Sequence, residues 1–593
     1  MSALPVWNLD SALTSYGGSQ QLMQQLTDDI ALLSDLYERH QIKAGPALEG
    51  EPPTAVFDEV LSRTAKALEL ERVLLLYHAG RCWADGTDAE ASTSYQLAQH
   101  RTAPLAALTA RLRAWAARLP VDRLTAASTV AAEHAHWLRQ CQSAVAHSLP
   151  DGQELLLSEL APTGHSAWQR LYEQMAATAA VAYEGELRPA AAIRADLNSP
   201  LPPRRSAAAD ALGRAWSSMA VPAAAALNAL LGHESTVAAM KGWPDLLDQR
   251  LAQEGIEPAI LTIANRAITD LLPHLDRFAR TKAQLLGAES LAWQDIAAPL
   301  PNEGCMAWLE AVDLVAGAFT KTAPQLARLA RAAARQRWVD AAPRPGKRGT
   351  ALCLPMGDAE SRIMVNFDGT ADSVYSLAHE FGHAYHHQCQ RGLDDLQRTS
   401  PLLLREAASM YAEHLLLSGA PATGSRRMHL LHAWLIGVYQ TCVGGYARFL
   451  FEREATLRRH DRPLTITDLD EITLTAQQAV YGPAVDPDTL PAHIWISHSH
   501  LYTSRFNSWP YYCGLLLALG LLPSAPPGAL ERLLANTGTA SPTALAAQLG
   551  ADLSRADFWA RGTRFIAAAV DEFESLATRH ATPPKARSAA WAA

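Results

Sequence analysis

The chain has 593 residues, of which 49% are hydrophobic and 19% charged, so it is too apolar for a disordered protein and too long for one small core. Its formal net charge is -9 and its basic residues form no stripe, which argues against nucleic acid as a partner. The seven cysteines are odd in number and include no CxxC pair, so reduced thiols and a cytoplasmic location are expected.

The first predicted elements are helices. The stretches 58–80, 105–118 and 168–187 are rich in Ala, Leu, Glu, Gln and Arg, and their apolar residues recur at helical spacing. This pattern predicts a mostly α fold. No fixed-period repeat is present, which argues against a solenoid.

A cluster of prolines at 198–205 is the best candidate for a domain boundary, because Pro ends or interrupts helices. We therefore expect an N-terminal helical lobe over residues 1–200 and a second domain over 201–593. The alternative is that this segment is a loop inside one continuous helical body.

Neither a secretory signal nor a membrane segment is expected. The N-terminal residues show no basic region followed by an apolar run. The most apolar stretch, which begins at Cys513, covers only about ten residues and is too short to span a bilayer as a helix.

The helical pattern is broken between residues 350 and 368. Two apolar runs, Ala351–Leu354 and Arg362–Phe367, flank the turn-forming sequence Met-Gly-Asp-Ala that begins at Met356. This arrangement predicts a β-hairpin. A small sheet at this place would form one wall of the site that follows, and its edge could hold an extended peptide by strand addition.

The sequence His-Glu-Phe-Gly-His at 379–383 follows the hairpin. Thr370 is a suitable N-cap, so the motif is expected on a helix. His379 and His383 are four residues apart, share one helix face and can bind one metal ion, while Glu380 points toward the place of an activated water. The motif therefore predicts a zinc hydrolase.

A second helix, expected from Ser400 to Gly419, supplies candidates for a third ligand, which catalytic zinc usually requires. Glu406 and Glu413 are seven residues apart on one face of this otherwise apolar stretch. We predict that Glu406 is a metal ligand and that Glu413 orients a ligand or the substrate. Either could instead be a structural carboxylate with a partner of its own.

Three sequence blocks resemble the thimet oligopeptidase and oligoendopeptidase F group of zinc metallopeptidases. The first block is the metal motif together with its neighbouring segments, residues 365–372, 379–384 and 405–409. The second is an opening Trp-x-Leu that begins at Trp7, and the third is the segment Trp293–Leu300. The resemblance implies one zinc ion per chain with Glu406 as third ligand. It also implies two helical lobes around a deep channel that excludes folded proteins and admits short peptides.

The resemblance extends to a block near the C-terminus, where it implies that His500 and Tyr511 stabilise the tetrahedral intermediate. The block departs from the family pattern at Asn507, which stands where the family has a tyrosine, while Tyr512 adds a hydroxyl after Tyr511. An asparagine amide can donate to an oxyanion but reaches less far than a phenol. We expect Tyr502, Asn507 and Tyr512 either to contact the substrate or to support a residue that does.

Asp372 begins the motif helix seven residues before His379 and on the same face, so it is a further candidate for orienting a ligand or substrate. Compensation of the helix dipole explains it equally well.

The predicted function is therefore a zinc-dependent endopeptidase that hydrolyses short peptides, with Glu380 moving the proton. A zinc carboxypeptidase and a narrow-specificity processing enzyme are the alternatives within the class. A non-catalytic peptide-binding protein is the alternative outside it.

Overall fold

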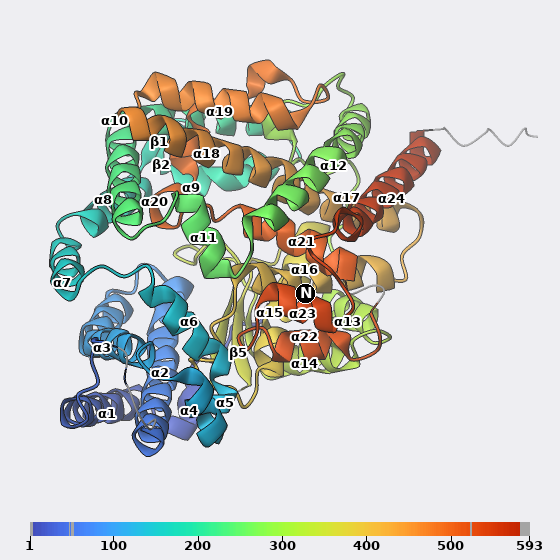
Figure 1. Ribbon diagram of the computed structural model, residues 1–593. Coiled ribbons are helices and arrows are strands. Elements are labelled where there is room, and N and C mark those ends of the chain that lie inside the picture. The colour runs from blue at the N-terminus through green and yellow to red at the C-terminus, as the bar shows by residue number, and fades with distance from the viewer. Residues whose placement is uncertain (1–3, 47, 49–52, 358, 522–524, 582–593) are drawn as a thin grey trace, which may run out of the picture.

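The computed structural model describes residues 4–46, 48, 53–357, 359–521 and 525–581. Helices predominate and two small sheets are present, so the mostly α fold predicted from the sequence is confirmed. Figure 1 shows the N-terminal helices as a separate group at the lower left, beside the segments that carry the predicted metal motif.

The first helices pack around a core of their own. Helices α1, α2 and α3 contact one another, and shorter helices cover their ends. Their bounds are α1 (Ser19–Arg39), α2 (Thr54–Ala84), α3 (Ala89–Ala116), α4 (Val121–Ala127), α5 (Thr129–Glu133) and α6 (Ala135–Val145).

The second and larger core is formed by the rest of the chain. Its elements before the metal motif are α7 (Asp151–Leu160), α8 (His165–Thr178), β1 (Ala180–Tyr183), β2 (Glu186–Pro189), α9 (Ala190–Ile193), α10 (Pro202–Met240), α11 (Leu246–Glu254), α12 (Pro258–Leu285), α13 (Trp308–Phe319) and α14 (Pro324–Arg335). Those after it are α17 (Gly424–Tyr439), α18 (Gly445–Asp461), α19 (Ile466–Tyr481), α20 (His500–Thr503), α21 (Trp509–Leu521), α22 (Ala529–Ala535), α23 (Pro542–Gln548) and α24 (Ala556–Ala581).

The two cores separate earlier in the chain than the boundary expected at residue 200. Cys141 is the last residue before the hairpin to join the first core, and Tyr172 is the first to join the second. The proline cluster instead begins the long helix α10, with Pro202 in its first turn, where the missing N–H costs no hydrogen bond. The division into domains at 200 and 201 stays a prediction.

Helix α10 is, among the described residues, the one helix long and apolar enough by composition to cross a membrane. It has 39 residues, and 56% of its most apolar window is buried inside the protein. Because core helices of folded proteins have the same composition, this helix is weak evidence for a membrane span.

The predicted hairpin is present and belongs to a three-stranded sheet. Strand β4 (Leu352–Met356) pairs antiparallel with β5 (Glu360–Met364), with Cys353 opposite Ile363. The sequence did not predict β3 (Val339–Asp340), which pairs parallel with β5. Asp358, in the predicted turn, lies outside the described residues.

Strand β5 is the central strand of this sheet, because the order is β3-β5-β4. An extended peptide could therefore not add beside β5 itself, and β4 is the edge of the sheet on that side. Pro355 removes one N–H donor from this edge.

The hairpin also joins the two cores. Leu354, Met356 and Met364 pack into the N-terminal core. The guanidinium of Arg72 on α2 donates to the carbonyl of Pro355 at 2.5 Å and to Asp395 Oδ1 at 2.7 Å. The sheet beside the metal motif is thus fixed to the first helical group.

Candidate metal centre and active site

The motif lies on helix α15 (Ala371–Cys389), as predicted. Thr370 caps the helix, since its hydroxyl accepts a hydrogen bond from the Ser373 N–H at 3.3 Å. Helix α16 (Leu402–Gly419) carries Glu406 and Glu413 and is packed directly against α15. Two adjacent helices therefore present the predicted ligands to each other.

Gly382 sets how closely these two helices approach. A Cβ at this position would lie 2.6 Å from Ser409 Cα and 2.8 Å from the carbonyl oxygen of Ala408. No side chain fits there without moving the backbone of α16. The glycine in the middle of the motif is thus required by the packing that brings the histidines to Glu406.

The side chains of His379, His383 and Glu406 meet between the helices, and their ligand atoms all lie within 4.8 Å of one another. Glu406 Oε2 is 3.7 Å from His379 Nε2 and 3.9 Å from His383 Nε2. The two imidazole rings stand nearly perpendicular, at 79°. Two imidazole nitrogens and a carboxylate at this spacing form a candidate metal site.

Glu413 lies behind His379. Its Oε1 accepts a hydrogen bond from His379 Nδ1 at 2.6 Å, which fixes the ring so that Nε2 faces His383 and Glu406. Burial would lower the pKa of His379, but the hydrogen bond and charge of Glu413 outweigh burial and raise the pKa to about 9. A carboxylate behind a metal-binding histidine increases the basicity of the ligand.

Glu380 is 4% exposed, and its Oε2 has no hydrogen-bond partner among the described residues. Burial raises the pKa of Glu380 to about 7; the charge of His379 lowers it in part, and Glu406 and Glu413 raise it. Cys353 on β4 lies close enough for Glu380 to raise the pKa of its thiol, after burial. The edge strand therefore lies beside this carboxylate, as the sequence predicted for the hairpin.

We expect Gly382→Ala to lower both stability and metal affinity, because the added methyl group must separate α15 from α16. Overpacking of this kind costs about 1–3 kcal/mol. Denaturation midpoints and metal titration of the purified variant measure the two effects. Gly437→Ala is the matched control, since a Cβ at Gly437 in helix α17 meets nothing within 4 Å. Equal behaviour of the two variants would contradict the packing argument.

We expect Glu413→Ala to weaken metal binding by roughly tenfold to a hundredfold, the usual effect of removing the partner of a metal-binding histidine. Glu413→Gln should lose less metal affinity, because its amide oxygen can still accept a hydrogen bond from His379 Nδ1. Competition with a chelator of known affinity gives both constants. Unchanged affinity in Glu413→Ala would remove Glu413 from the site.

Asp372 stands apart from this cluster. Its side chain is exposed, and no hydrogen bond joins it to His379 or Glu413 in the part of the chain that the structure describes. Although part of Asp372 reaches solvent, the surrounding protein desolvates its carboxyl and raises the pKa, and the charges of Asp368 and Glu413 raise this pKa further. A role in orienting ligand or substrate stays a prediction.

The C-terminal block is brought to the site by helix α21, which packs on α16. At Gly514 an added Cβ would lie 2.9 Å from the carbonyl oxygen of Leu403 and 3.4 Å from Glu406 Cβ. Tyr511, one turn earlier, lies within electrostatic range of Glu406: burial and then the Glu406 charge raise the pKa of Tyr511 to about 12. Tyr511 thus keeps its phenolic proton near neutral pH.

Tyr511 and His500 line one cavity, and His500 is exposed at its surface. Burial and the charge of Arg448 lower the pKa of His500. Both side chains expected to act on the intermediate therefore face the same space.

The other expected residues of this block are buried away from the cavity. Tyr502 is fully buried and stacks on Tyr172 with ring centroids 3.6 Å apart. Tyr512 is also fully buried, and its hydroxyl donates to Asn265 Oδ1 at 2.7 Å. Neighbouring helices cover both tyrosines, so direct contact with the substrate is contradicted, while a role in supporting a neighbouring site residue stays a prediction.

Asn507 is 7% exposed and accepts from Arg250 at 3.4 Å. It also lies close enough to Tyr511 to lower the pKa of that phenol in part, against burial and Glu406. Asn507 is thus placed to orient Tyr511, and its effect on rate stays a prediction.

Arg448 in helix α18 is a residue of this region that sequence reasoning missed. It lines the cavity with His500 and Tyr511. The available signal was a single arginine in the otherwise apolar run Ala447–Phe451.

Comparison with known proteins agrees with this geometry. The profile of Peptidase family M3 matches residues 325–427, which include the three candidate ligands, and that of Oligopeptidase F matches 121–179. A relative from Lactococcus lactis subsp. cremoris, named oligoendopeptidase F, is 24% identical over 340 residues. That alignment covers 55% of this chain and 56% of the relative, so the chain spans little more than half the length of the curated relative it matches.

Solved structures match over nearly the whole chain. A putative peptidase from Chlamydophila abortus has a TM-score of 0.77 at 18% identity, covering 96% of this chain and 98% of its own. Oligoendopeptidase F from Enterococcus faecium has a TM-score of 0.69 at 17% identity, covering 94% and 98%. At such identities these matches show the fold. Together with the sequence matches, they confirm the resemblance to the oligoendopeptidase F group.

Proposed function

We propose that this protein is a zinc-dependent endopeptidase that hydrolyses short, unstructured peptides. The observation that carries the proposal is the meeting of His379, His383 and Glu406, with ligand atoms within 4.8 Å, beside the buried carboxylate of Glu380. The matches to Peptidase family M3 and oligoendopeptidase F support it.

The residues present fit a zinc ion. Zinc in hydrolases is bound by neutral imidazoles and a carboxylate and keeps a position open, and this donor set offers three ligands of those types. Glu413 holds His379 in the orientation in which Nε2 is free to bind. Zinc held there would act as a Lewis acid, which polarises a carbonyl and makes water a stronger nucleophile.

Glu380 is the proposed proton carrier. Its unpartnered Oε2 would take the proton from the attacking water and pass it to the nitrogen of the leaving amine. A carboxylate whose pKa burial has raised to about 7 is suited to both transfers.

Tyr511 and His500 are the proposed stabilisers of the oxyanion. The phenol of Tyr511 keeps its proton near neutral pH, so its O–H is available as a donor. An N–H of the His500 imidazole would be a second donor in the shared cavity. Donors fixed before the reaction need no rearrangement when charge develops.

Two helical lobes around a deep channel, which would exclude folded proteins, are part of this proposal. The two separate cores support it, since the fixed sheet beside the motif lies where they meet. A cytoplasmic location stays a prediction.

Metal analysis of the purified protein, combined with mass-spectrometric profiling of digested peptide mixtures, tests the proposal. We expect one zinc per chain and cleavage at internal bonds, giving two fragments longer than one residue. Peptides blocked at both ends should still be cut. Release of single C-terminal residues would favour the carboxypeptidase alternative, cleavage of one peptide alone the processing enzyme, and bound zinc without hydrolysis the non-catalytic binding protein.

A further inference from the structure

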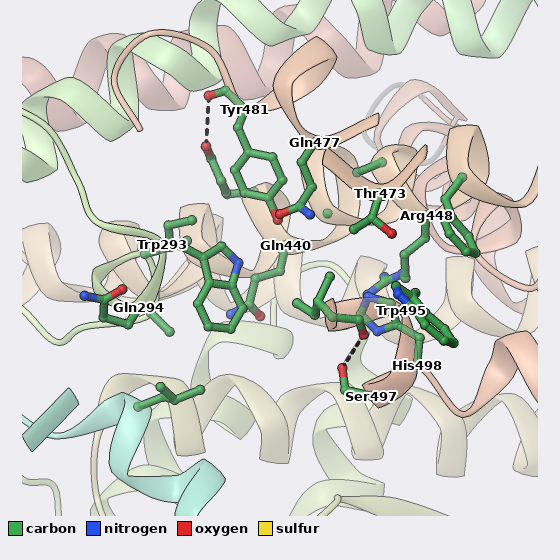
Figure 2. A pocket seen from close by; sticks show the side chains of 18 of the residues that line it. Trp293, Gln294, Gln440, Arg448, Thr473, Gln477, Tyr481, Trp495, Ser497 and His498 are labelled. Carbon is green, nitrogen blue, oxygen red and sulfur yellow. Dashed lines mark hydrogen bonds between the residues drawn. The ribbon is translucent and has the colours of Figure 1, made fainter. Parts of the chain in front are cut away.

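A cavity of about 680 Å³ lies among helices and loops of the second core, and the side chains expected to stabilise the intermediate are part of its lining. Its volume is in the range that holds small-molecule ligands, and a peptide segment of a few residues would fit. Figure 2 shows Trp293 and Tyr481 on one side and Arg448, His498 and Trp495 on the other. His500 and Tyr511 also line it, so the cavity contains the two proposed oxyanion donors, although none of the candidate metal ligands is among its lining residues.

The charged side chains that line the cavity are positive. Two arginines, Arg194 and Arg448, are among the residues that line it, and no Asp or Glu of the described chain is. The charge of Arg448 also lowers the pKa of His498 and of His500, after burial in each case. The electrostatics of this space therefore favour an anion.

Arg448 itself has no ion pair among the described residues. Its one direct hydrogen bond runs from Nε to Ser508 Oγ and is long, at 3.4 Å. Glu452 is one turn further along α18, but its Oε1 accepts from the Phe506 N–H at 2.8 Å instead of pairing with the guanidinium. Burial lowers the pKa of Arg448, and the neighbouring Tyr481, Glu452 and Tyr511 offset only part of that effect.

An arginine in this setting is unusual because burying a charge without a partner is expensive. The planar guanidinium has five N–H donors in a fork that matches a carboxylate. The donors of Arg448 that face the cavity are thus available to an anionic group of a ligand.

The walls around Arg448 are held in place before any ligand binds. Lys282 is fully buried and donates to the carbonyl oxygens of Ile296 and Ala298 at 2.6 and 2.7 Å, which fixes the segment that carries Trp293. On another side, the π-helical turn Gln440–Gly444 interrupts the junction of α17 and α18 and turns Gln440 toward the cavity. Such turns occur frequently at functional sites.

We propose that this cavity binds the free C-terminal carboxylate of the substrate peptide, with Arg448 as its counter-ion. The inference rests on the proposed peptidase function and narrows its substrate class to short peptides whose C-terminus lies a few residues beyond the cleaved bond. A terminal carboxylate occurs on every unmodified peptide, so this contact selects by length and not by sequence. An acidic side chain is the other source of the same group.

Pairs of peptides that differ only in a free or amidated C-terminus test the proposal. In the wild-type protein, amidation should lower kcat/KM by about tenfold to a hundredfold, the effect of losing a hydrogen bond to a charged group. In Arg448→Met the ratio of acid to amide should fall close to one, while Arg448→Lys should keep part of it. Arg453→Met is the control, because Arg453 is exposed on the same helix, and it should keep the wild-type ratio.

Two outcomes would overturn the proposal. One is equal cleavage of acid and amide by the wild-type protein. The other is an equal loss on both peptides in Arg448→Met, which would make Arg448 a structural residue. Amidated peptides with Glu or Gln near the C-terminus distinguish the two sources of carboxylate: if Glu restores the rate, the cavity binds an acidic side chain and the terminal assignment is wrong.

A binding measurement separates this inference from the proposed peptidase function. Trp293 and Trp495 line the cavity, so tryptophan fluorescence should report binding of short peptides to the full-length Glu380→Gln protein without turnover. Tighter binding of the acid than of the amide supports the inference even where no peptide is hydrolysed. Equal binding overturns it even where hydrolysis is efficient. This comparison needs no change at Arg448 and is decisive should Arg448→Met fail to fold.

Discussion

Replacement of Glu380 by Gln should lower peptide hydrolysis by about 10²- to 10⁴-fold, the contribution of a general base, while bound zinc is retained. Gln has nearly the volume of Glu and cannot accept and return a proton. Glu380 is buried, with one oxygen lacking a partner, so the exchange removes no hydrogen bond that supports α15. The substitution should therefore lower kcat and leave the stability of the fold unchanged.

Steady-state kinetics on a fluorogenic peptide, together with metal analysis and thermal denaturation of the same preparation, measure this prediction. Glu454→Gln is the matched control, because Glu454 is partly exposed on α18, far along the chain from the motif, and pairs with Arg458. A Glu380→Gln protein that keeps zinc and still turns over at the wild-type rate would exclude Glu380 as the base. Loss of zinc along with activity would instead mean that Glu380 supports the metal site.

Local patterns in the sequence were sufficient to predict the elements nearest the candidate metal site. The hairpin, the cap at Thr370 and the two facing helices follow from turn residues, capping chemistry and helical spacing, all of which act within a few residues. The cluster of His379, His383 and Glu406 follows from the same spacings once the two helices are in contact.

Features that depend on distant segments could not be predicted in this way. Strand β3 has two residues, too few to give a local pattern, and its partner β5 lies more than twenty residues further along the chain. Contact of Tyr502 and Tyr512 with the substrate was one expectation, because they flank His500 and Tyr511 in sequence. Contacts with Tyr172 and Asn265, more than two hundred residues away, determine that they are buried instead.

The same limit applies to Arg448. A single arginine in an apolar helical run usually reaches the surface or pairs with an acid, and its own helix offers Glu452 one turn away. Only the packed structure shows that Glu452 is engaged by the Phe506 N–H and that the guanidinium faces a cavity lined by distant segments.

Glu406→Ala should abolish high-affinity metal binding, with a loss larger than the roughly tenfold to hundredfold expected at Glu413. The reason is that Glu406 contributes the one oxygen among the three candidate ligand atoms, within 4 Å of both imidazoles. Two histidines from one helix would leave the ion held on one side only.

Without metal, Glu406→Ala should raise the free energy of unfolding of the protein or leave it unchanged. Burial raises the pKa of Glu406, so the folded chain holds this carboxylate at a cost that is recovered when a cation binds. Removing it from the metal-free protein relieves that cost. Adding zinc at about a hundred times its dissociation constant should stabilise the wild-type protein by about 2.7 kcal/mol and leave Glu406→Ala nearly unchanged.

Thermal denaturation with and without zinc therefore separates a ligand from a structural carboxylate at this position. Glu454→Ala is the control and should respond to zinc as the wild-type protein does. If Glu406 were a structural carboxylate, the variant would be destabilised in the absence of metal and would keep the full response to zinc. If Glu406 is a ligand, the variant should not be destabilised without metal and should lose the stabilisation by zinc, because a ligand stabilises the protein only when the ion is bound.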